Sequence, residues 1–214
     1  GVPMANLEMI QYHPTTVPIG GKRMLISEAA RGEGGRLFAM RDGKPWYFME
    51  EKYPELGNLM PRDITAREIW TVRQQSEVFL DMTGLAPDVY EKKLSGLAED
   101  CRVYLGEDIR KEPISVSPGI HYFMGGIKVD LSSKTSMDQL YAIGETACNG
   151  VHGKNRLASN SLLESLVFAK RAAKEMTEQF DRTKIEEISY REDDYTDKKK
   201  LATEYKALLK AEIA

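Results

Sequence analysis

The stretch LYAIGETACNGVHGKNRLASNSLLESLVFA, residues 140–169, decides the fold class. Its first part is a short apolar run ending in Gly-Glu, which predicts a buried strand of a parallel sheet over residues 140–147, with Glu145 at its carboxyl end. A long helix is expected after the glycine-rich turn, from near Asn160 to about Gln179. The residues expected on its inward face are Leu162, Leu163, Leu166, Val167 and Ala169. This order of strand, turn and helix is typical of α/β folds that bind a ligand at the turn.

The preceding residues predict a mixed α+β region. A strand is expected over residues 4–12, followed by a turn at HPTTVPIGG, and a short helix over 27–35 that Ser27 opens. Residues 38–60 are interpreted as a hairpin or an irregular connection. Pro61 precedes a helix over 62–75 with Ile64, Ile69, Trp70 and Val72 on its apolar face. A strand at EVFLDMT, a helix over 87–97 and an extended segment over 112–130 complete the region.

The composition of the chain excludes several classes of protein. The chain has 214 residues, a net charge of −3 and 42% hydrophobic residues, which is typical of a folded globular protein. The balanced charge gives no field for nucleic acid, and the longest apolar run is far shorter than the roughly 20 residues of a membrane span. Cys101 and Cys148 have no short spacing, so we expect neither disulfides nor a metal site, and a cytoplasmic location.

Several charged residues predict an anion site. Arg62 follows Pro61 at a helix start, where the helix dipole disfavours a cation by about 0.3–1 kcal/mol, so a carboxylate or an anionic ligand should hold it. Arg156, in the polar turn before the long helix, can bind a carboxylate through two parallel hydrogen bonds. Glu28 and Arg31 lie three residues apart and are therefore neighbours on a helix. A charge-assisted hydrogen bond contributes about 1.5–3 kcal/mol, which exceeds the dipole penalty.

Residues 181–214 are rich in charge and predict a linker followed by one amphipathic helix. The apolar stripe of that helix would consist of Leu201, Tyr205, Leu208 and Leu209. One such helix cannot bury its stripe alone, so it requires a partner helix.

Six strings resemble the succinate dehydrogenase/fumarate reductase flavoprotein family, in the family's order, over roughly residues 4–180. They are EMIQYHPTT, LISEAARGEGG, PRDITARE, EPISVSPGIHYFMGGIKVD, LYAIGETACNGVHG and NRLASNSLLESLVFA. Within that family, Ala158-Ser159 in NRLASNSLLE is more similar to the L-aspartate oxidases than to the respiratory subunits. The resemblance implies an FAD enzyme that transfers a hydride between a four-carbon dicarboxylate and the flavin. The dicarboxylate would be aspartate, fumarate or succinate, and oxidation of aspartate to iminoaspartate leads to quinolinate and NAD.

The resemblance also implies a role for each matching residue. Arg62 matches the proton donor or acceptor, and Glu28 and Arg31 match its proton relay. The residues that match or line the carboxylate-binding pocket are His13, Thr15, Ser27, His121 and Arg156. The residues that match contacts to FAD are Glu145, Asn160, Ser161 and Leu162. From the residues alone, a lone histidine with a structural role and Asn160 as a simple helix cap remain open alternatives.

The chain also departs from the family pattern. Lys154 stands where the family usually has Ala, and the sequence contains no GxGxxG segment to hold the FAD pyrophosphate. The resemblance divides the chain into residues 1–6, the end of an FAD-binding segment; 7–122, a capping domain that binds substrate; 123–180, the return of the FAD-binding domain; and 181–214, the start of a helical domain. We therefore expect a fragment whose partner is the missing N-terminal part of the same enzyme.

Three hypotheses follow. The first is a fragment of an enzyme that oxidises L-aspartate, and the second is a fumarate reductase or succinate dehydrogenase flavoprotein subunit. The third is an isolated capping module without activity.

Overall fold

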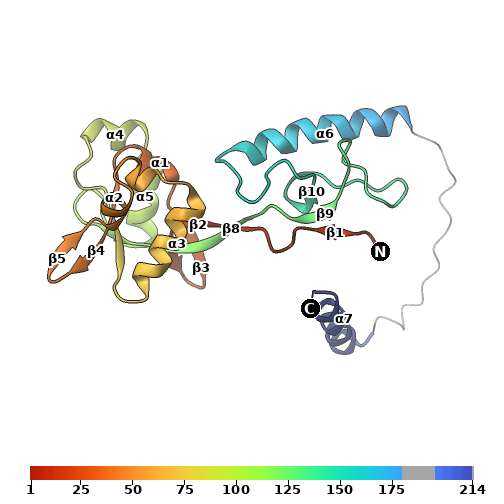
Figure 1. Cartoon of the computed structure of the whole chain (residues 1–214), viewed down its shortest axis with the longest axis horizontal. Coiled ribbons are helices and arrows are strands. Elements are labelled where there is room, and N and C mark those ends of the chain that lie inside the picture. The colour runs from red at the N-terminus through yellow and green to blue at the C-terminus, as the bar shows by residue number, and fades with distance from the viewer. Residues whose placement is uncertain (180–195, 214) are drawn as a thin grey trace. The chain divides into compact units, whose positions relative to one another are not determined.

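The computed structural model of the chain describes residues 1–179 and 196–213 (Figure 1). They fall into two compact units, Gly1–Glu178 and Gln179–Ala214. The first unit is mixed α/β, as expected. The second contains helix α7 (Lys198–Ile213), on which Tyr205, Leu208 and Leu209 are exposed. The predicted linker falls mainly on residues outside those that are described.

The helices of the first unit are α1 (Glu28–Gly32), α2 (Phe48–Lys52), α3 (Arg62–Arg73), α4 (Pro87–Lys92), α5 (Ser95–Tyr104) and α6 (Asn160–Glu178), with 3-10 turns η1 (Gly57–Leu59) and η2 (Gly144–Thr146). Helices α3 and α6 are the longest of the first unit, and the others have ten residues or fewer. No helix among the described residues is long and apolar enough to cross a membrane.

The first sheet has the strand order β3-β2-β8 and carries much of the candidate site. Its strands are β2 (Ile10–Ile19), β3 (Lys22–Leu25) and β8 (Ser117–Phe123). The turn expected within residues 13–21 is present at Gly20 and Gly21, both with positive φ, but its expected start at His13 is wrong, because β2 continues to Ile19. A register shift against β8 between His13 and Thr16 accommodates Pro14 within the strand.

The second sheet forms the main core together with the short helices. Its order is β5-β4-β6-β7, with β4 (Arg36–Arg41), β5 (Lys44–Trp46), β6 (Val78–Asp81) and β7 (Ile114–Ser115). Strands β4 and β5 pair antiparallel as a hairpin, which is one of the two structures expected within residues 38–60. Fully buried Leu37, Ile69, Leu80 and Ile114 belong to this core.

The third sheet joins segments far apart in sequence. Strand β9 (Gly126–Lys128) pairs antiparallel with β1 (Met4–Ala5) and parallel with β10 (Ala147–Cys148). Gly125 allows this approach, because a Cβ there would lie 1.9 Å from the carbonyl oxygen of Asn6. The predicted buried strand over residues 140–147 is wrong: Tyr141 forms only an isolated bridge with Lys134, Gly144, with φ of +71°, starts a 3-10 turn, and the strand β10 contains only Ala147 and Cys148.

Helix α6 has the predicted length but the opposite orientation. Leu162, Leu163 and Leu166 are each more than 60% exposed, and Val167 and Ala169 are also exposed. The side facing the rest of the unit contains Glu164, Phe168 and Ala172, spaced four residues apart. The inward prediction failed because it followed the apolar stripe, whereas the buried side includes a carboxylate that accepts a hydrogen bond from Asn149 at 2.6 Å.

Two other helix predictions need correction. The helix expected over residues 87–97 is two helices, α4 and α5, separated at Lys93 and buried Leu94. Helix α3 ends at Arg73, and Trp70, expected on its apolar face, is 64% exposed. The buried side of α3 instead contains Arg62, Thr65, Ala66, Glu68 and Ile69.

Candidate functional site

A cavity of about 530 Å³ lies where β2, β8, α1, the start of α3 and the turn before α6 meet. The sequence-predicted residues that line it are His13, Ser27, Glu28, Arg62, His121 and Arg156. Leu25, Ala29, Gly32, Ala158 and Ser159 complete the lining. The fold thus brings together residues from five separate parts of the sequence.

Arg62 and Glu28 form the central pair of the cavity. Arg62 donates from Nη2 and Nε to Glu28 Oε2, at 2.7 and 3.0 Å. Arg31 Nη2 lies 3.6 Å from Glu28 Oε1, so one carboxylate connects two guanidinium groups. Ser27 caps α1 by accepting from the Ala29 N–H and places Glu28 in the first turn. The expectation that a carboxylate holds Arg62 at the start of its helix is confirmed.

Arg31 lies behind the cavity, almost completely buried. Its Nη1 donates to the Asn58 carbonyl oxygen at 2.6 Å, and burial lowers the pKa of its guanidinium. Its Nε makes no hydrogen bond to the described residues. Arg31 therefore adds positive charge behind Glu28 without contacting the cavity space.

Arg156 lies on the opposite side of the cavity, in the turn before α6. Its guanidinium stacks over the Tyr122 ring at 4.4 Å from the centroid, and Nη1 donates to Ser161 Oγ at 3.2 Å. Burial is the main cause that lowers the pKa of Arg156, and repulsion from Arg62 lowers it further. Its buried Nε has no hydrogen-bond partner among the described residues. A buried donor of this kind suits an anionic ligand.

The two histidines contact each other edge to face, with ring centroids 5.2 Å apart. Burial, followed by repulsion from Arg62, lowers the pKa of His13 to about 3. Burial, followed by repulsion from Arg156, also lowers the pKa of His121. His13 Nε2 is buried without a partner among the described residues. His13 is therefore a neutral ring near pH 7, with a nitrogen still to be satisfied.

Thr15 does not line the cavity, contrary to expectation. Its hydroxyl is fully buried and donates to the Ile26 carbonyl oxygen at 2.9 Å. Its backbone nitrogen lies 3.3 Å from His13 Nδ1, and its carbonyl oxygen lies 3.1 Å from the same atom. Thr15 thus fixes the orientation of the His13 ring and has no hydroxyl available for a substrate.

The residues that the resemblance assigns to FAD lie at the 3-10 turn η2 and at the start of α6. Glu145 is exposed, and its Oε1 accepts from the Phe123 N–H at 2.9 Å, which orients a carboxylate suited to ribose hydroxyls. Asn160 and Ser161 begin α6. The N–H of Leu162 donates to the Ser159 carbonyl oxygen at 3.1 Å. Glu145 is thus oriented to accept from ribose hydroxyls, whereas the Leu162 N–H is not free for a flavin ring and the sequence has no GxGxxG for the pyrophosphate.

Comparison with known families supports the same cofactor. Residues 1–162 match the family described as FAD binding domain. The chain belongs to this family. FAD is therefore its assigned cofactor, and the expectation of a flavoprotein is confirmed.

The relatives include both enzyme types that the sequence suggested. The chain is 46% identical over 175 residues to the succinate dehydrogenase flavoprotein subunit of Bacillus subtilis, covering 78% of this chain and 30% of that protein. It is 44% identical over 190 residues to the L-aspartate oxidase of Clostridium perfringens, and the match covers 86% of this chain and 41% of that protein. The chain thus spans about a third of the length of the curated relatives that it matches.

Solved structures agree with the fold. An E. coli quinol fumarate reductase is 35% identical, with a TM-score of 0.71 over 83% of this chain and 33% of the other. A quinol-fumarate reductase with menaquinol molecules is 34% identical, with a TM-score of 0.77 over 88% of this chain and 35% of the other.

Sequence reasoning missed a polar bridge beside the cavity. Buried Gln11 donates from Nε2 to Asn155 Oδ1 at 2.8 Å and to the Arg156 carbonyl oxygen at 2.7 Å. Its Oε1 accepts from Arg62 Nη1 at 3.4 Å. Asn155 Nδ2 in turn donates to Asp63 Oδ1 at 3.0 Å. The only signal in the sequence was that Gln11 interrupts an apolar segment.

Proposed function

We propose that this chain forms the dicarboxylate-handling part of a flavin-dependent oxidoreductase that oxidises L-aspartate to iminoaspartate. The charge of the cavity is the observation that supports a dicarboxylate, and the similarity to L-aspartate oxidases supports aspartate as that dicarboxylate. Arg62 and Arg156 line the cavity and Arg31 lies behind it, Glu28 is the only acidic residue among the described residues that line it, and the two histidines have lowered pKa values. The cations in and behind the cavity therefore outnumber the carboxylate that lines it, which favours an anionic ligand such as a dicarboxylate.

Two separate positions suit the two carboxylate groups. Arg156 and His121 lie on one side of the cavity, and Ser27 and Arg62 line it from α1 and α3. An arginine can donate two parallel hydrogen bonds to one carboxylate, which fixes its plane as well as its distance. A four-carbon dicarboxylate bound at both positions would be held in one orientation.

Glu28 supplies a proton path to Arg62. Its side chain is 35% exposed, and its Oε2 accepts two hydrogen bonds from Arg62, whose side chain is only 10% exposed. An arginine is ordinarily always protonated, so its use as an acid or base requires a dry site and a nearby carboxylate. Glu28 can return a proton from solvent to Arg62 Nη2. When bound, FAD supplies the acceptor for the two electrons.

The proposed division of the chain follows the same reasoning. Residues 7–122 would cap the substrate, residues 1–6 and 123–180 would belong to the FAD-binding domain, and 181–214 would begin a helical domain. The third sheet supports this division, since it joins β1 to β9 and β10. The missing N-terminal part of the enzyme would supply the pyrophosphate site, in a cytoplasmic protein.

A succinate dehydrogenase or fumarate reductase flavoprotein subunit is the second candidate. It is supported by the 46% identity to the Bacillus subtilis subunit, and it uses the same cavity charge. Assays of aspartate oxidation against succinate oxidation by the FAD-loaded protein distinguish the two. An isolated capping module would show neither activity.

The first experiment is an absorption spectrum of the purified chain after incubation with excess FAD and removal of free cofactor. Retained flavin absorption is expected if the residues at α6 and Glu145 suffice for binding. A spectrum without flavin would show that this chain alone does not hold the cofactor, and FAD would then depend on the missing N-terminal part.

The second experiment tests the dicarboxylate site by calorimetric titration with fumarate. Arg156→Leu should weaken binding about 10- to 100-fold, because each buried charge-assisted bond contributes about 1.5–3 kcal/mol. The matched control is Arg102→Leu, an exposed arginine on α5 paired with Glu99, which should bind fumarate as the unchanged chain does. Equal affinity of the two variants would contradict the proposal. In the active enzyme, Arg62→Leu should abolish turnover.

A further inference from the structure

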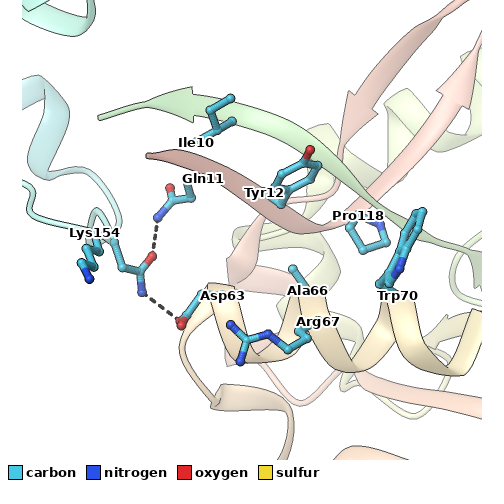
Figure 2. A pocket seen from close by; sticks show the side chains of 10 residues that line it. Ile10, Gln11, Tyr12, Asp63, Ala66, Arg67, Trp70, Pro118 and Lys154 are labelled. Carbon is cyan, nitrogen blue, oxygen red and sulfur yellow. Dashed lines mark hydrogen bonds between the residues drawn. The ribbon is translucent and has the colours of Figure 1, made fainter. Parts of the chain in front are cut away.

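A second cavity, of about 350 Å³, lies beside the dicarboxylate cavity and shares no lining residue with it (Figure 2). It is formed by β2, β8, α3 and the turn at residues 154–155. Gln11 lines it and also contacts Arg62 and Arg156, so this side chain separates the two cavities. Its volume is at the lower end of the range of about 300–1,000 Å³ for small-molecule sites.

One wall of this second cavity is apolar and aromatic. Figure 2 shows Tyr12, Pro118 and Trp70 along the same side, above helix α3. Tyr12 is 47% exposed and Trp70 is 64% exposed. Aromatic side chains bury about 150–250 Å² when covered, so this wall offers a large contact area to a flat ring.

The polar side carries an excess of positive charge. Arg67 and Lys154 line the cavity, and neither makes a hydrogen bond or ion pair through its side chain among the described residues. Asp63 is the only acidic lining residue among them, and its carboxylate accepts from Asn155. Figure 2 shows the Arg67 guanidinium extending away from Trp70, toward the end where Asp63 lies.

We propose that this second cavity binds a small aromatic monocarboxylate, with its ring against Trp70 and Tyr12 and its carboxylate at Arg67 and Lys154. Two cations and one carboxylate leave one positive charge, which matches a monoanion. A polyphosphate carries several negative charges, which exceed this single excess positive charge, so it is disfavoured. The proposal is independent of the proposed oxidoreductase activity, because it uses no residue of the dicarboxylate cavity.

The two tryptophans of the chain provide the test. The probe is 4-phenylbenzoate, titrated into the ¹⁵N-labelled full chain, and the readout is the indole N–H signal of each tryptophan. The Trp70 signal should shift in a saturable way. The Trp46 signal should not, because its Nε1 donates to Glu51 at 2.7 Å and lies outside the second cavity. A shift of Trp46 alone, or of neither, would overturn the proposal.

The second test compares the affinity of the probe for variants that lack the charge of Arg67 or Lys154. Because exposed ion pairs contribute about 0.2–1 kcal/mol each, Arg67→Gln and Lys154→Gln should each weaken binding about threefold, and the double variant about tenfold. The matched control Lys44→Gln, an exposed residue of β5, should leave the affinity unchanged. Equal affinity of the double variant, or of the neutral amide of the probe, would refute the carboxylate assignment. Displacement of the probe by fumarate would place it in the dicarboxylate cavity and refute the site.

Discussion

Acidification should destabilise this chain through His13. In the folded chain, burial lowers the pKa of His13 to about 3, whereas an unfolded chain has a histidine pKa of about 6.5. Between these two pKa values, the histidine therefore binds a proton in the unfolded state and is neutral in the folded state. Stability contributed by the neutral ring is fully present above the unfolded pKa and is lost as pH falls toward the folded pKa.

The magnitude follows from the two pKa values. At about pH 4.5 the unfolded histidine is almost fully protonated and the folded one is almost fully neutral. This pH lies about two units below the pKa of the unfolded histidine. At about 1.36 kcal/mol per unit, His13 alone should lower the free energy of unfolding by about 2.5 kcal/mol between pH 7 and pH 4.5. His13 is 1% exposed, so solvent screening does not reduce this value.

The assay is urea denaturation of the chain and of His13→Gln at both pH values. Groups that do not contact the His13 ring, such as His152, titrate in both proteins, so their effects cancel in the difference between the two pH slopes. The unchanged chain should lose about 2.5 kcal/mol more than the variant. Equal losses would refute the assignment of His13 as a buried neutral ring. If the variant does not fold, the pKa of His13 measured by NMR tests the same point, and a value near 6.5 contradicts it.

Three further predictions concern stability. Asn58→Ala should lower the free energy of unfolding by about 1–3 kcal/mol in urea denaturation, because the Asn58 Oδ1 accepts from a buried backbone N–H of β4 at 2.9 Å; an unchanged midpoint would contradict this. Gly125→Ala should cost about 3 kcal/mol by thermal melting, because its Cβ would meet the Asn6 carbonyl oxygen, while Gly96→Ala, with open space around its Cβ, should cost nothing. Leu166→Gln should change stability by less than about 0.5 kcal/mol because Leu166 is 63% exposed, and a loss above about 2 kcal/mol would restore the inward orientation first predicted for it.

Local sequence signals predicted several elements well. Ser27 with Glu28 marked the start of α1, and Pro61 marked the start of α3, because both signals act within one helical turn. The charge argument for Arg62 also needed only its position at a helix start. Such inferences succeed because the physical cause lies within a few residues of the effect.

Predictions that depended on burial were less successful. The apolar stripe of α6 suggested an inward face, yet Glu164 and Phe168 occupy the buried side. Trp70 looked like a core residue and instead lines the second cavity. Hydrophobic spacing shows that a surface is apolar but does not show what covers it, and this is decided by residues distant in sequence. The meeting of His13, Arg62 and Arg156 likewise could be anticipated only through the family resemblance.

The geometry of the dicarboxylate cavity also limits where substrate discrimination can arise. Aspartate differs from succinate by a charged amino group, which would be attracted by a free carboxylate. Among the described residues that line the cavity, Glu28 is the only acidic one, and it is engaged by Arg62 at Oε2 and faces Arg31 at Oε1. An ammonium group placed there would compete with two guanidinium groups for one carboxylate. In the proposed function, the lining cations would bind both carboxylates of aspartate or of succinate, so a preference for aspartate would have to come from residues other than those that line this cavity.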